Sequence, residues 1–311
     1  MLPFYIFETL SIIYFLGALG GGFYLLKNHR AHFFKGIMLP LFLFVGLILS
    51  LKIQLEPYQL TIREQAIETG KLKQEIQVAL ISDTHLRPLK RGWFLEKTAQ
   101  NLQIKKPDLI FLAGDFLFHD QMEKFTPDFS AFKKFSDIAP TYAVLGNHDY
   151  GIADFDQKLF YIDQHQKIIE LLEEVGVKVL IDENVTINIK DSEISLVGFD
   201  EFWHKEKNPA KAIAGLKQAA LIIGISHNPD AAYLPESQNL DMILSGHTHG
   251  GQMRLPLIGS LAEAQTVFPR VDYGAVLLQN KPIIANTVGL GESGFPIRFF
   301  NRPEILILQI K

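Results

Sequence analysis

The sequence predicts an α/β protein in which two apolar helices precede a sheet domain. From residue 76 onward, short apolar runs alternate with helix-like segments, and this alternation is typical of an α/β sheet. Near the carboxyl end, strand-like runs follow one another with no room for helices between them. At the amino end, residues 2–26 carry only Glu8 as a charge and residues 36–51 carry none. A chain of 311 residues is long enough for one large domain and an appendage.

The two apolar runs predict a membrane hairpin over residues 1–52. The first run exceeds the roughly 20 residues needed to cross a bilayer, whereas the second is short unless it borrows neighbours. A helical hairpin buried in a soluble core is the alternative, but both runs are apolar all round rather than along one stripe. A signal peptide fits poorly, since no basic region precedes the first run. The loop with Lys27, Arg30 and Lys35 favours the cytoplasm, but later basic residues compete and leave the orientation open.

The polar residues 53–75 are expected to connect this hairpin to a domain over residues 76–311. Strands are expected within 76–83, 108–115, 141–149, 193–200, 219–227 and 240–247. Helices are expected around 92–105 and 164–175, and a third is expected to begin at Asn208 and Pro209. The runs 274–279, 281–287 and 304–310 are expected to pair antiparallel, because their connections are too short for crossover helices.

Charge and cysteine content narrow the classes of function. The net charge of −4 and the pI of about 6.2 show no basic excess that would indicate a nucleic-acid partner. Cysteine is absent, which excludes thiolate metal sites and cysteine nucleophiles. Any metal ion must therefore be held by histidine and oxygen ligands.

Residues suited to metal binding or proton transfer follow five of the expected strands. The loops beyond the carboxyl ends of strands build the ligand sites of α/β sheets, so these residues should converge. They are Asp83 and His85, Asp115, Asn147 with His148 and Asp149, His227, and His247 with His249.

The number and type of these residues predict two divalent ions. Imidazole, carboxylate and amide oxygen suit Mn, Fe or Zn. One site of four to six ligands cannot use all the candidates, whereas two sites that share Asp115 can. Such a pair clamps a phosphate and activates water. Gly246, Gly250 and Gly251 let the backbone around His247 and His249 pass close to both ions.

The motifs DTHL (83–86), GD (114–115), GNHD (146–149), a lone His227 and GHTH (246–249) resemble the calcineurin-like metallophosphoesterase superfamily. The resemblance extends to GHTHGGQMRLP (246–256) and PIRFFNRPEILIL (296–308), and it is greatest to the bacterial branch of membrane-associated phosphodiesterases. That branch includes UDP-2,3-diacylglucosamine pyrophosphatases of lipid A synthesis. With it we expect a four-layer α/β/β/α sandwich of two mixed sheets; a single doubly wound sheet is the alternative.

The resemblance also implies roles for individual residues. It implies a first metal held by Asp83, His85, Asp115 and His249, and a second held by Asp115, Asn147, His227 and His247. His148 would contact the phosphate and help the leaving oxygen depart, with Asp149 orienting it.

The implied activity is hydrolysis of a phosphodiester or pyrophosphate by a metal-bridging hydroxide. A lipid-linked substrate such as UDP-2,3-diacylglucosamine and a place in the bacterial inner membrane, on an undecided side, are expected. A non-catalytic binding module on the same fold and a nuclease are the alternatives.

Two loops leave their role open. Arg87 and Lys90 stand where such proteins more often have a small residue, and we expect them in a solvated loop rather than on the substrate. Phe202 and Trp203 follow a strand at the same edge. We expect them to pack under their loop, the alternative being that they grip an apolar part of the substrate.

Overall fold

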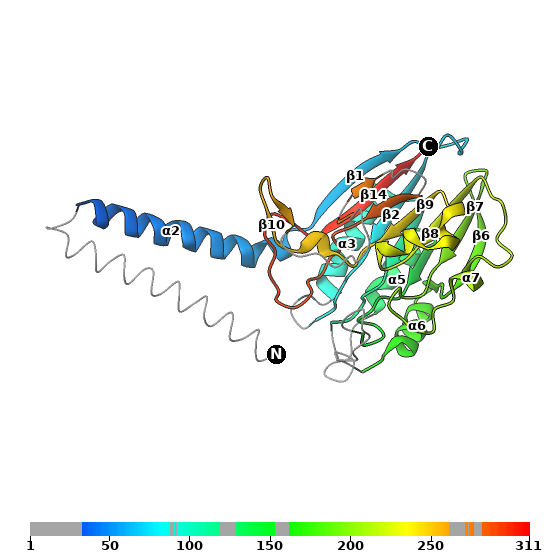
Figure 1. Cartoon of the computed structure of the whole chain (residues 1–311), viewed down its shortest axis with the longest axis horizontal. Coiled ribbons are helices and arrows are strands. Elements are labelled where there is room, and N and C mark those ends of the chain that lie inside the picture. Colours follow the sequence, from blue (N-terminus) through cyan, green and yellow to red (C-terminus); the bar gives the residue numbers. More distant parts are fainter. Residues whose placement is uncertain are drawn as a thin grey trace.

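The structure is a computed structural model in which a long helix projects from a two-sheet domain (Figure 1). It describes residues 33–87, 90, 92–118, 129–152, 162–260, 271–272, 274–276 and 282–311. Of residues 33–39 and 42 only the backbone is described.

The first sheet has the order β1-β14-β2-β3-β4-β5. Its members are β1 (Thr61–Ile67), β14 (Glu304–Ile310), β2 (Ile76–Ile81), β3 (Leu109–Ala113), β4 (Thr141–Val144) and β5 (Lys178–Val179). Strands β2 to β5 run parallel, whereas β14 is antiparallel to β2 and parallel to β1. The sheet is therefore mixed, and the carboxyl ends of β2, β3 and β4 share one edge.

The second sheet has the order β12-β13-β9-β8-β7-β6. Its members are β12 (Gly274–Val276), β13 (Ile283–Asn286), β9 (Met242–Ser245), β8 (Leu221–Ile225), β7 (Ser192–Gly198) and β6 (Glu183–Ile189). The strands β13, β9, β8 and β7 are parallel, and antiparallel strands flank them on both sides. This sheet is also mixed.

Apolar side chains from both sheets form a common core between them. Val78, Leu80 and Phe111 of the first sheet belong to the same buried cluster as Ile223 and Leu244 of the second. A second cluster joins the other face of the first sheet to α3 (Gly92–Lys105), α5 (Ser130–Ile138) and α6 (His165–Glu174). The outer face of the second sheet packs against α7 (Pro209–Ala212) and the short helix η2 (Pro229–Tyr233). The two sheets thus lie face to face between helical layers, and a single doubly wound sheet is excluded.

The carboxyl-terminal strands differ from the expectation that they pair antiparallel with one another. Only β12 and β13 do so; β13 runs parallel to β9. The last strand, β14, joins the first sheet between β1 and β2. The reason is its burial on both faces, since six of its seven residues, all but Gln309, are buried. The helix expected from Asn208 is also shorter than a typical helix, with four residues capped by the Asn208 side chain.

Residues 53–75, expected to be a connector, contribute a strand. β1 pairs in parallel with β14 along its whole length, from Thr61 opposite Glu304 to Ile67 opposite Ile310. Its polar sequence fits an edge strand, because only Ile67 is fully buried. The fold of the sheet domain therefore begins at β1, ahead of the predicted start at residue 76.

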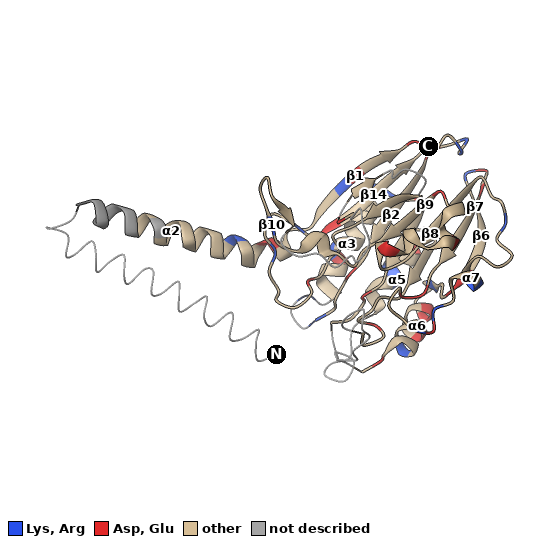
Figure 2. Ribbon diagram, in the orientation of Figure 1, with Lys and Arg blue, Asp and Glu red and all other residues tan. Residues whose placement is uncertain are grey.

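The second apolar run lies within the helix α2 (Phe33–Leu55), as predicted, and the first run lies outside the described residues. Among the helices in the described residues, none is both long enough and apolar enough to cross a bilayer. Among the α2 residues whose side chains are described, the charged one is Lys52, at the domain end of the helix, where it pairs with Glu56 at 2.7 Å; Figure 2 shows the rest of this part uncharged. The backbone N–H of Arg298 donates to the carbonyl of Ile53 and fixes this end to the domain.

Candidate metal centre

The predicted metal-binding residues lie in five loops at one edge of the two sheets. Asp83 and His85 follow β2, Asp115 follows β3, and Asn147 follows β4. His227 follows β8, while His247 and His249 follow β9 and lead into the short helix η4 (His249–Gly251). Because the sheets pack face to face, the first three loops meet the last two.

Most of these residues have an unusual backbone conformation. Asp83, His85, Asp115, His247 and His249 all have positive φ angles, between 39° and 67°. Residues with a side chain seldom adopt this left-handed region, and when they do they are often at functional sites. The conformation turns each loop sharply after its strand.

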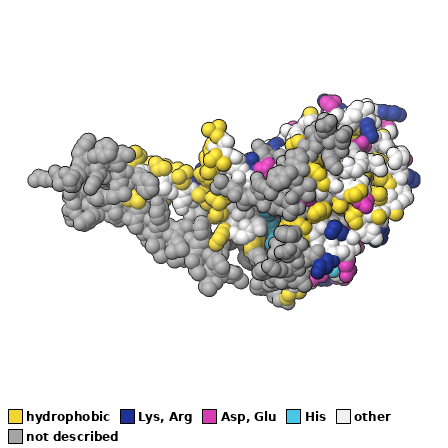
Figure 3. Space-filling view, viewed as in Figure 1, with side chains coloured by type: hydrophobic (Ala, Val, Ile, Leu, Met, Phe, Trp, Pro, Cys, Tyr) yellow, Lys and Arg dark blue, Asp and Glu magenta, His cyan; other side chains and the backbone are white. Residues whose placement is uncertain are grey.

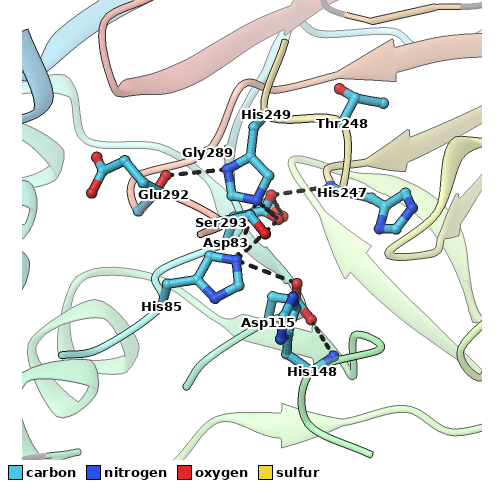
Figure 4. Close-up of polar contacts among 12 residues, drawn as sticks. Asp83, His85, Asp115, His148, His247, Thr248, His249, Gly289, Glu292 and Ser293 are labelled. Carbon is cyan, nitrogen blue, oxygen red and sulfur yellow. Dashed lines mark hydrogen bonds and ion pairs between the residues drawn. The ribbon is translucent and has the colours of Figure 1, made fainter. Parts of the chain in front are cut away.

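Four of the predicted ligands form a compact group (Figure 4). One donor atom from each of Asp83, His85, Asp115 and His249 lies within 4.8 Å of the others. The Nε2 atoms of His85 and His249 are 3.2 Å apart, and Nε2 of His249 is 3.3 Å from Oδ1 of Asp83. Nε2 of His85 is 3.4 Å from Oδ2 of Asp115. These are the four residues that the resemblance assigns to the first metal.

The residues assigned to the second metal lie on the other side of Asp115. Nε2 of His227 is 3.3 Å from Oδ2 of Asp115 and 3.2 Å from Nδ1 of His247. The Asn147 amide nitrogen donates to the carbonyl of Ile152 at 2.7 Å, which leaves its Oδ1 atom for another role. Asp115 Oδ2 therefore stands between His85 and His227.

Several buried atoms of this group have no hydrogen-bond partner among the described residues. They are Oδ1 of Asp83, Oδ1 of Asn147 and Nε2 of His247. A buried polar atom without a partner is costly in a folded protein, and a metal ion is one way to satisfy it. The ring nitrogens that face one another are also too close for two charged imidazoles. The donor set thus fits divalent cations.

The electrostatics of the group favour the same conclusion. Burial lowers the pKa of His85 and His247 well below 6.5, and burial together with Arg298 lowers the pKa of His249 to about 3. These rings therefore keep a free lone pair at neutral pH, as a metal ligand must. Burial alone raises the pKa of Asp115, but His227 and His148 outweigh it and hold the value well below 3.8.

The pKa values of two further residues of the group, Asp83 and His227, are raised. Burial raises the pKa of Asp83 to about 6, and the negative charge of Asp115 adds to this effect. Burial alone lowers the pKa of His227, but Asp115 and Asp83 outweigh it and raise the value well above 6.5. A protonated His227 thus neutralises the charge of both carboxylates. A bound metal cation would take over this role.

His148 lies beside this group. Its ring is 4.9 Å from that of His85, at right angles to it, and its backbone N–H donates to Oδ1 of Asp115 at 2.9 Å. Burial lowers the pKa of His148 below 6.5, although Asp115 opposes this effect. The ring therefore reaches the edge of the metal group and is not one of the clustered donors.

Asp149 lies next to His148 in the sequence and contacts the backbone of both neighbouring loops. Its carboxylate accepts three backbone N–H groups, from Asp115 at 3.0 Å, Phe116 at 2.9 Å and Gly146 at 2.8 Å. These contacts tie the loop after β3 to the loop after β4. Asp149 thus fixes the loops that carry Asp115 and His148 through their backbone.

The expectation that Arg87 and Lys90 lie in a solvated loop is wrong. Both are buried, with 6% and 2% of their surface exposed. Lys90 Nζ lies 2.5 Å from Oε1 of Glu292, Arg298 Nε lies 3.3 Å from the same oxygen, and Arg87 donates to the Glu292 carbonyl. Both Arg87 and Lys90 thus have Glu292 as a partner, and Glu292 lies about 200 positions further along the chain, so the local sequence around Arg87 does not reveal it.

Phe202 and Trp203 are both partly buried, and Trp203 also contacts the centre. Its ring packs against the apolar cluster of the first sheet and lies 4.7 Å from the His247 ring, edge to face. Packing under the loop, as expected for Trp203, thus coexists with a contact to a predicted ligand. The neighbouring Glu201 was not predicted; it is fully buried, and burial raises its pKa to about 7.

Asn301 is another residue that the sequence did not indicate. Its side chain donates to the carbonyl of His249 at 2.6 Å, and its backbone N–H donates to the buried carboxylate of Glu56. It thereby connects the end of α2 to the loop that carries His249. No local pattern marks it, although it lies within the segment 296–308 on which the resemblance drew.

Comparison with known proteins agrees with this arrangement. The family model described as calcineurin-like phosphoesterase matches residues 76–251, which contain every predicted site residue. Phosphodiesterase YaeI of Escherichia coli (strain K12) is 31% identical over 210 residues, 66% of this chain and 71% of that protein.

Two further relatives cover more of the chain. An uncharacterized metallophosphoesterase of Aquifex aeolicus (strain VF5) is 27% identical over 281 residues, 86% of this chain and 98% of that protein. UDP-2,3-diacylglucosamine pyrophosphatase LpxG of Chlamydia muridarum (strain MoPn / Nigg) is 24% identical over 280 residues, 75% of this chain and 83% of that protein.

Proposed function

The chain belongs to the calcineurin-like phosphoesterase family and is a hydrolase that acts on phosphoester bonds, and from this premise we propose that it is a membrane-anchored phosphodiesterase or pyrophosphatase with two metal ions. The observation that carries the proposal is the convergence of Asp83, His85, Asp115 and His249 within 4.8 Å. His227 and His247 continue this group on the far side of Asp115.

We assign one ion to Asp83, His85, Asp115 and His249 and the other to Asp115, Asn147, His227 and His247. When bound, divalent ions such as Mn, Zn or Fe supply the Lewis acidity that activates water and neutralises charge on the phosphate. The buried, neutral imidazoles of His85, His247 and His249 offer lone pairs without a proton to displace, whereas His227 would give up its proton to a cation. Oδ1 of Asp83 and Oδ1 of Asn147, which have no hydrogen-bond partner among the described residues, would be metal ligands as well.

The residues of the chain itself place and move protons. His148 stands at the edge of the group, 4.9 Å from the His85 ring between ring centres, where it would contact a phosphate oxygen. Burial keeps this ring neutral in the free site, and the negative charge of a bound phosphate would favour the protonated ring that gives its proton to the leaving oxygen. Asp149 keeps this geometry fixed, because its carboxylate holds the backbone of both neighbouring loops. A rigid support of this kind is what precise positioning requires.

The substrate that we propose is a lipid-linked phosphodiester or pyrophosphate. The name of the relative LpxG, UDP-2,3-diacylglucosamine pyrophosphatase, makes that nucleotide lipid the first candidate. The apolar residues 2–26 and 36–51 support attachment to the bacterial inner membrane. An enzyme held at the bilayer meets lipid head groups at a high effective concentration, which a soluble metabolite would not share.

Purified full-length protein tests the reaction and the substrate separately. With Mn or Zn added, we expect hydrolysis of a nitrophenyl phosphodiester and release of UMP from UDP-2,3-diacylglucosamine. Loss of both reactions across several metals would contradict the proposed activity. Cleavage of the nitrophenyl diester without UMP release would contradict this lipid substrate and leave the phosphoesterase standing.

The side of the membrane on which the catalytic domain lies distinguishes between classes of lipid substrate. Reporters that work on only one side of the membrane, fused after Lys311, reveal where the domain lies. A cytoplasmic domain would agree with the nucleotide lipid as substrate. A domain on the outer side would exclude it and indicate a lipid or polymer of the cell envelope.

A further inference from the structure

A small hairpin beside the metal centre exposes apolar side chains. Strands β10 (Arg254–Leu255) and β11 (Gly259–Ser260) pair antiparallel, and the turn between them is Pro256–Ile258. Leu257 is fully exposed and Ile258 is 72% exposed. No residue from Leu255 to Ser260 is charged. Turns exposed to water are usually built from polar residues and glycine, so the apolar residues of this tip are unusual.

The hairpin tip belongs to a larger apolar ridge, which we define as Leu257, Ile258, Phe295, Phe300 and Leu55. Phe295, Phe300 and Leu55 are each 50% or more exposed. Phe300 and residues 254–259 line one open hollow of about 480 Å³. Lys52 of α2 lies 4.2 Å above the Phe300 ring, so the ridge reaches the end of that helix. Figure 3 shows apolar side chains on the part that projects beside α2.

The ridge continues along α2. Leu41, Phe44, Ile48 and Leu51 are all at least 44% exposed on the helix that projects from the domain. Exposed apolar side chains therefore occur both along the helix and on the ridge beside its domain end.

Hydrogen bonds connect the segments that carry the ridge to the loop that carries His249. The hairpin begins five residues after His249, and the Arg254 side chain donates to the carbonyl of Gly250 at 2.9 Å. Asn301, which follows Phe300, donates to the carbonyl of His249 at 2.6 Å. A molecule with its apolar tail on the ridge would thus have its polar end close to His249.

We propose that the apolar ridge contacts the acyl region of a phospholipid bilayer and holds the tails of the lipid substrate there. This inference rests on the proposed membrane-bound phosphoesterase and adds the surface that orients the domain on the membrane. The hairpin lies among the acyl chains, while the metal centre lies at the level of the head groups. A protein partner or a second copy of the chain on the ridge is the competing occupant.

The chain contains no cysteine, so a single introduced cysteine gives a label at one known place. We would prepare full-length Leu257→Cys with an environment-sensitive fluorophore in vesicles of phosphatidylethanolamine and phosphatidylglycerol. The control is Ile104→Cys, at the far end of α3 and 76% exposed. We expect nitroxide-labelled acyl chains to quench the fluorophore at 257 and leave that at 104 unchanged.

Three outcomes would overturn the proposal. Equal quenching at both positions would show that the label reports only attachment by another segment. If the protein is shown to be in the vesicles and the emission of the label at 257 is that of a fluorophore in water, the proposal is contradicted directly. Emission from 257 that changes with protein density but not with nitroxide lipid would assign the ridge to a second copy.

Activity gives an independent readout. In Leu257→Ser/Ile258→Ser, we expect the ratio of turnover on UDP-2,3-diacylglucosamine in vesicles to turnover on the nitrophenyl diester to fall about tenfold, because two apolar contacts with the acyl chains are lost. Ile104→Ser should keep the ratio. An unchanged ratio in the double variant would refute the proposal that the ridge holds the tails of the lipid substrate. A wild-type chain inactive on both substrates would refute the proposed function itself.

Discussion

At the scale of single residues, buried charges around the metal centre are balanced by partners that lie far away in the sequence. Glu292 accepts from Lys90, which lies 202 positions away in the sequence, and also from the nearby Arg298. Asp115 lies between His85 and His227 in the same way. Removal of one member leaves the others uncompensated, so single substitutions should separate the roles of these residues.

Substitution of a shared ligand should differ from substitution of a proton donor. We expect Asp115→Ala to lose both metal ions and nearly all activity. His148→Ala should keep its metals and lose turnover by about 10²–10⁴-fold, the usual contribution of a positioned acid or base. Metal content by elemental analysis and kcat measure the two effects. An equal loss of metal in both variants would make His148 a ligand and our assignment wrong.

Glu292→Gln should destabilise the protein in a pH-dependent way. Burial alone raises the pKa of Glu292, but Lys90, Arg298 and Arg87 together lower it below 4.5. A carboxyl with a lowered folded-state pKa stabilises the fold above pH 4.5, and this contribution is lost as the pH falls through the folded-state pKa. We expect a loss of about 3–5 kcal/mol in the free energy of unfolding at pH 7, typical for a broken buried ion pair.

Urea unfolding across pH measures this effect. The difference between wild type and Glu292→Gln should shrink below pH 4.5. Glu170→Gln is the matched control, because Glu170 pairs with Lys167 at 3.0 Å on the surface. Its removal should change the free energy of unfolding by less than about 1 kcal/mol. A pH-independent loss in Glu292→Gln would indicate a packing role instead.

At the scale of elements, the loops after the strands are packed so closely that glycine is required. A Cβ atom on Gly246, in the loop between β9 and His247, would overlap the Ser82 hydroxyl and lie 2.6 Å from Oδ2 of Asp83. The same Asp83 oxygen accepts the backbone N–H of His247 at 3.0 Å. The two loops that hold Asp83 and His247 therefore share one set of contacts and move together.

Gly246→Ala should displace both loops and lower activity about 100-fold, the effect of misplacing a catalytic group by about 1 Å. Its metal affinity should fall as well. Gly215→Ala is the control, since a Cβ there meets nothing within 4 Å although its φ of +67° adds strain. That variant should lose about 1–2 kcal/mol of stability and keep its metals. Normal metal affinity in Gly246→Ala, measured by titration, would contradict this packing argument.

At the scale of the whole molecule, the metal centre joins the two sheets. Asp83, His85 and Asp115 come from the first sheet, while His227 and His249 come from the second. The common core holds the sheets together across their faces. At the edge, however, like charges and unpartnered atoms face one another, so bound cations should stabilise the assembly of the two sheets.

Removal of metal should therefore lower the melting temperature. An ion at 100 times its Kd adds about 2.7 kcal/mol to the free energy of unfolding, which for a chain of 311 residues is a shift of roughly 4 °C. Differential scanning calorimetry with a chelator, and then with Mn restored, measures the shift. Asp115→Ala should show no response to Mn. A wild-type melting temperature unaffected by chelation would show that the centre does not link the sheets.

The sequence by itself determined the chemistry of the site and most of the elements that carry it. Alternating apolar runs located β2, β3 and α3, and polar residues after the strands gave the candidate ligands, because both signals are local in the chain. The tertiary structure decided what depends on long-range pairing. It placed β14 in the first sheet, made an edge strand of residues 61–67, buried Arg87 and Lys90 against Glu292 and Arg298, and turned Asp149 toward backbone N–H groups. Burial and ion pairing depend on residues about 200 positions apart, as Lys90 and Glu292 are, and no local pattern records which distant segment will supply the partner.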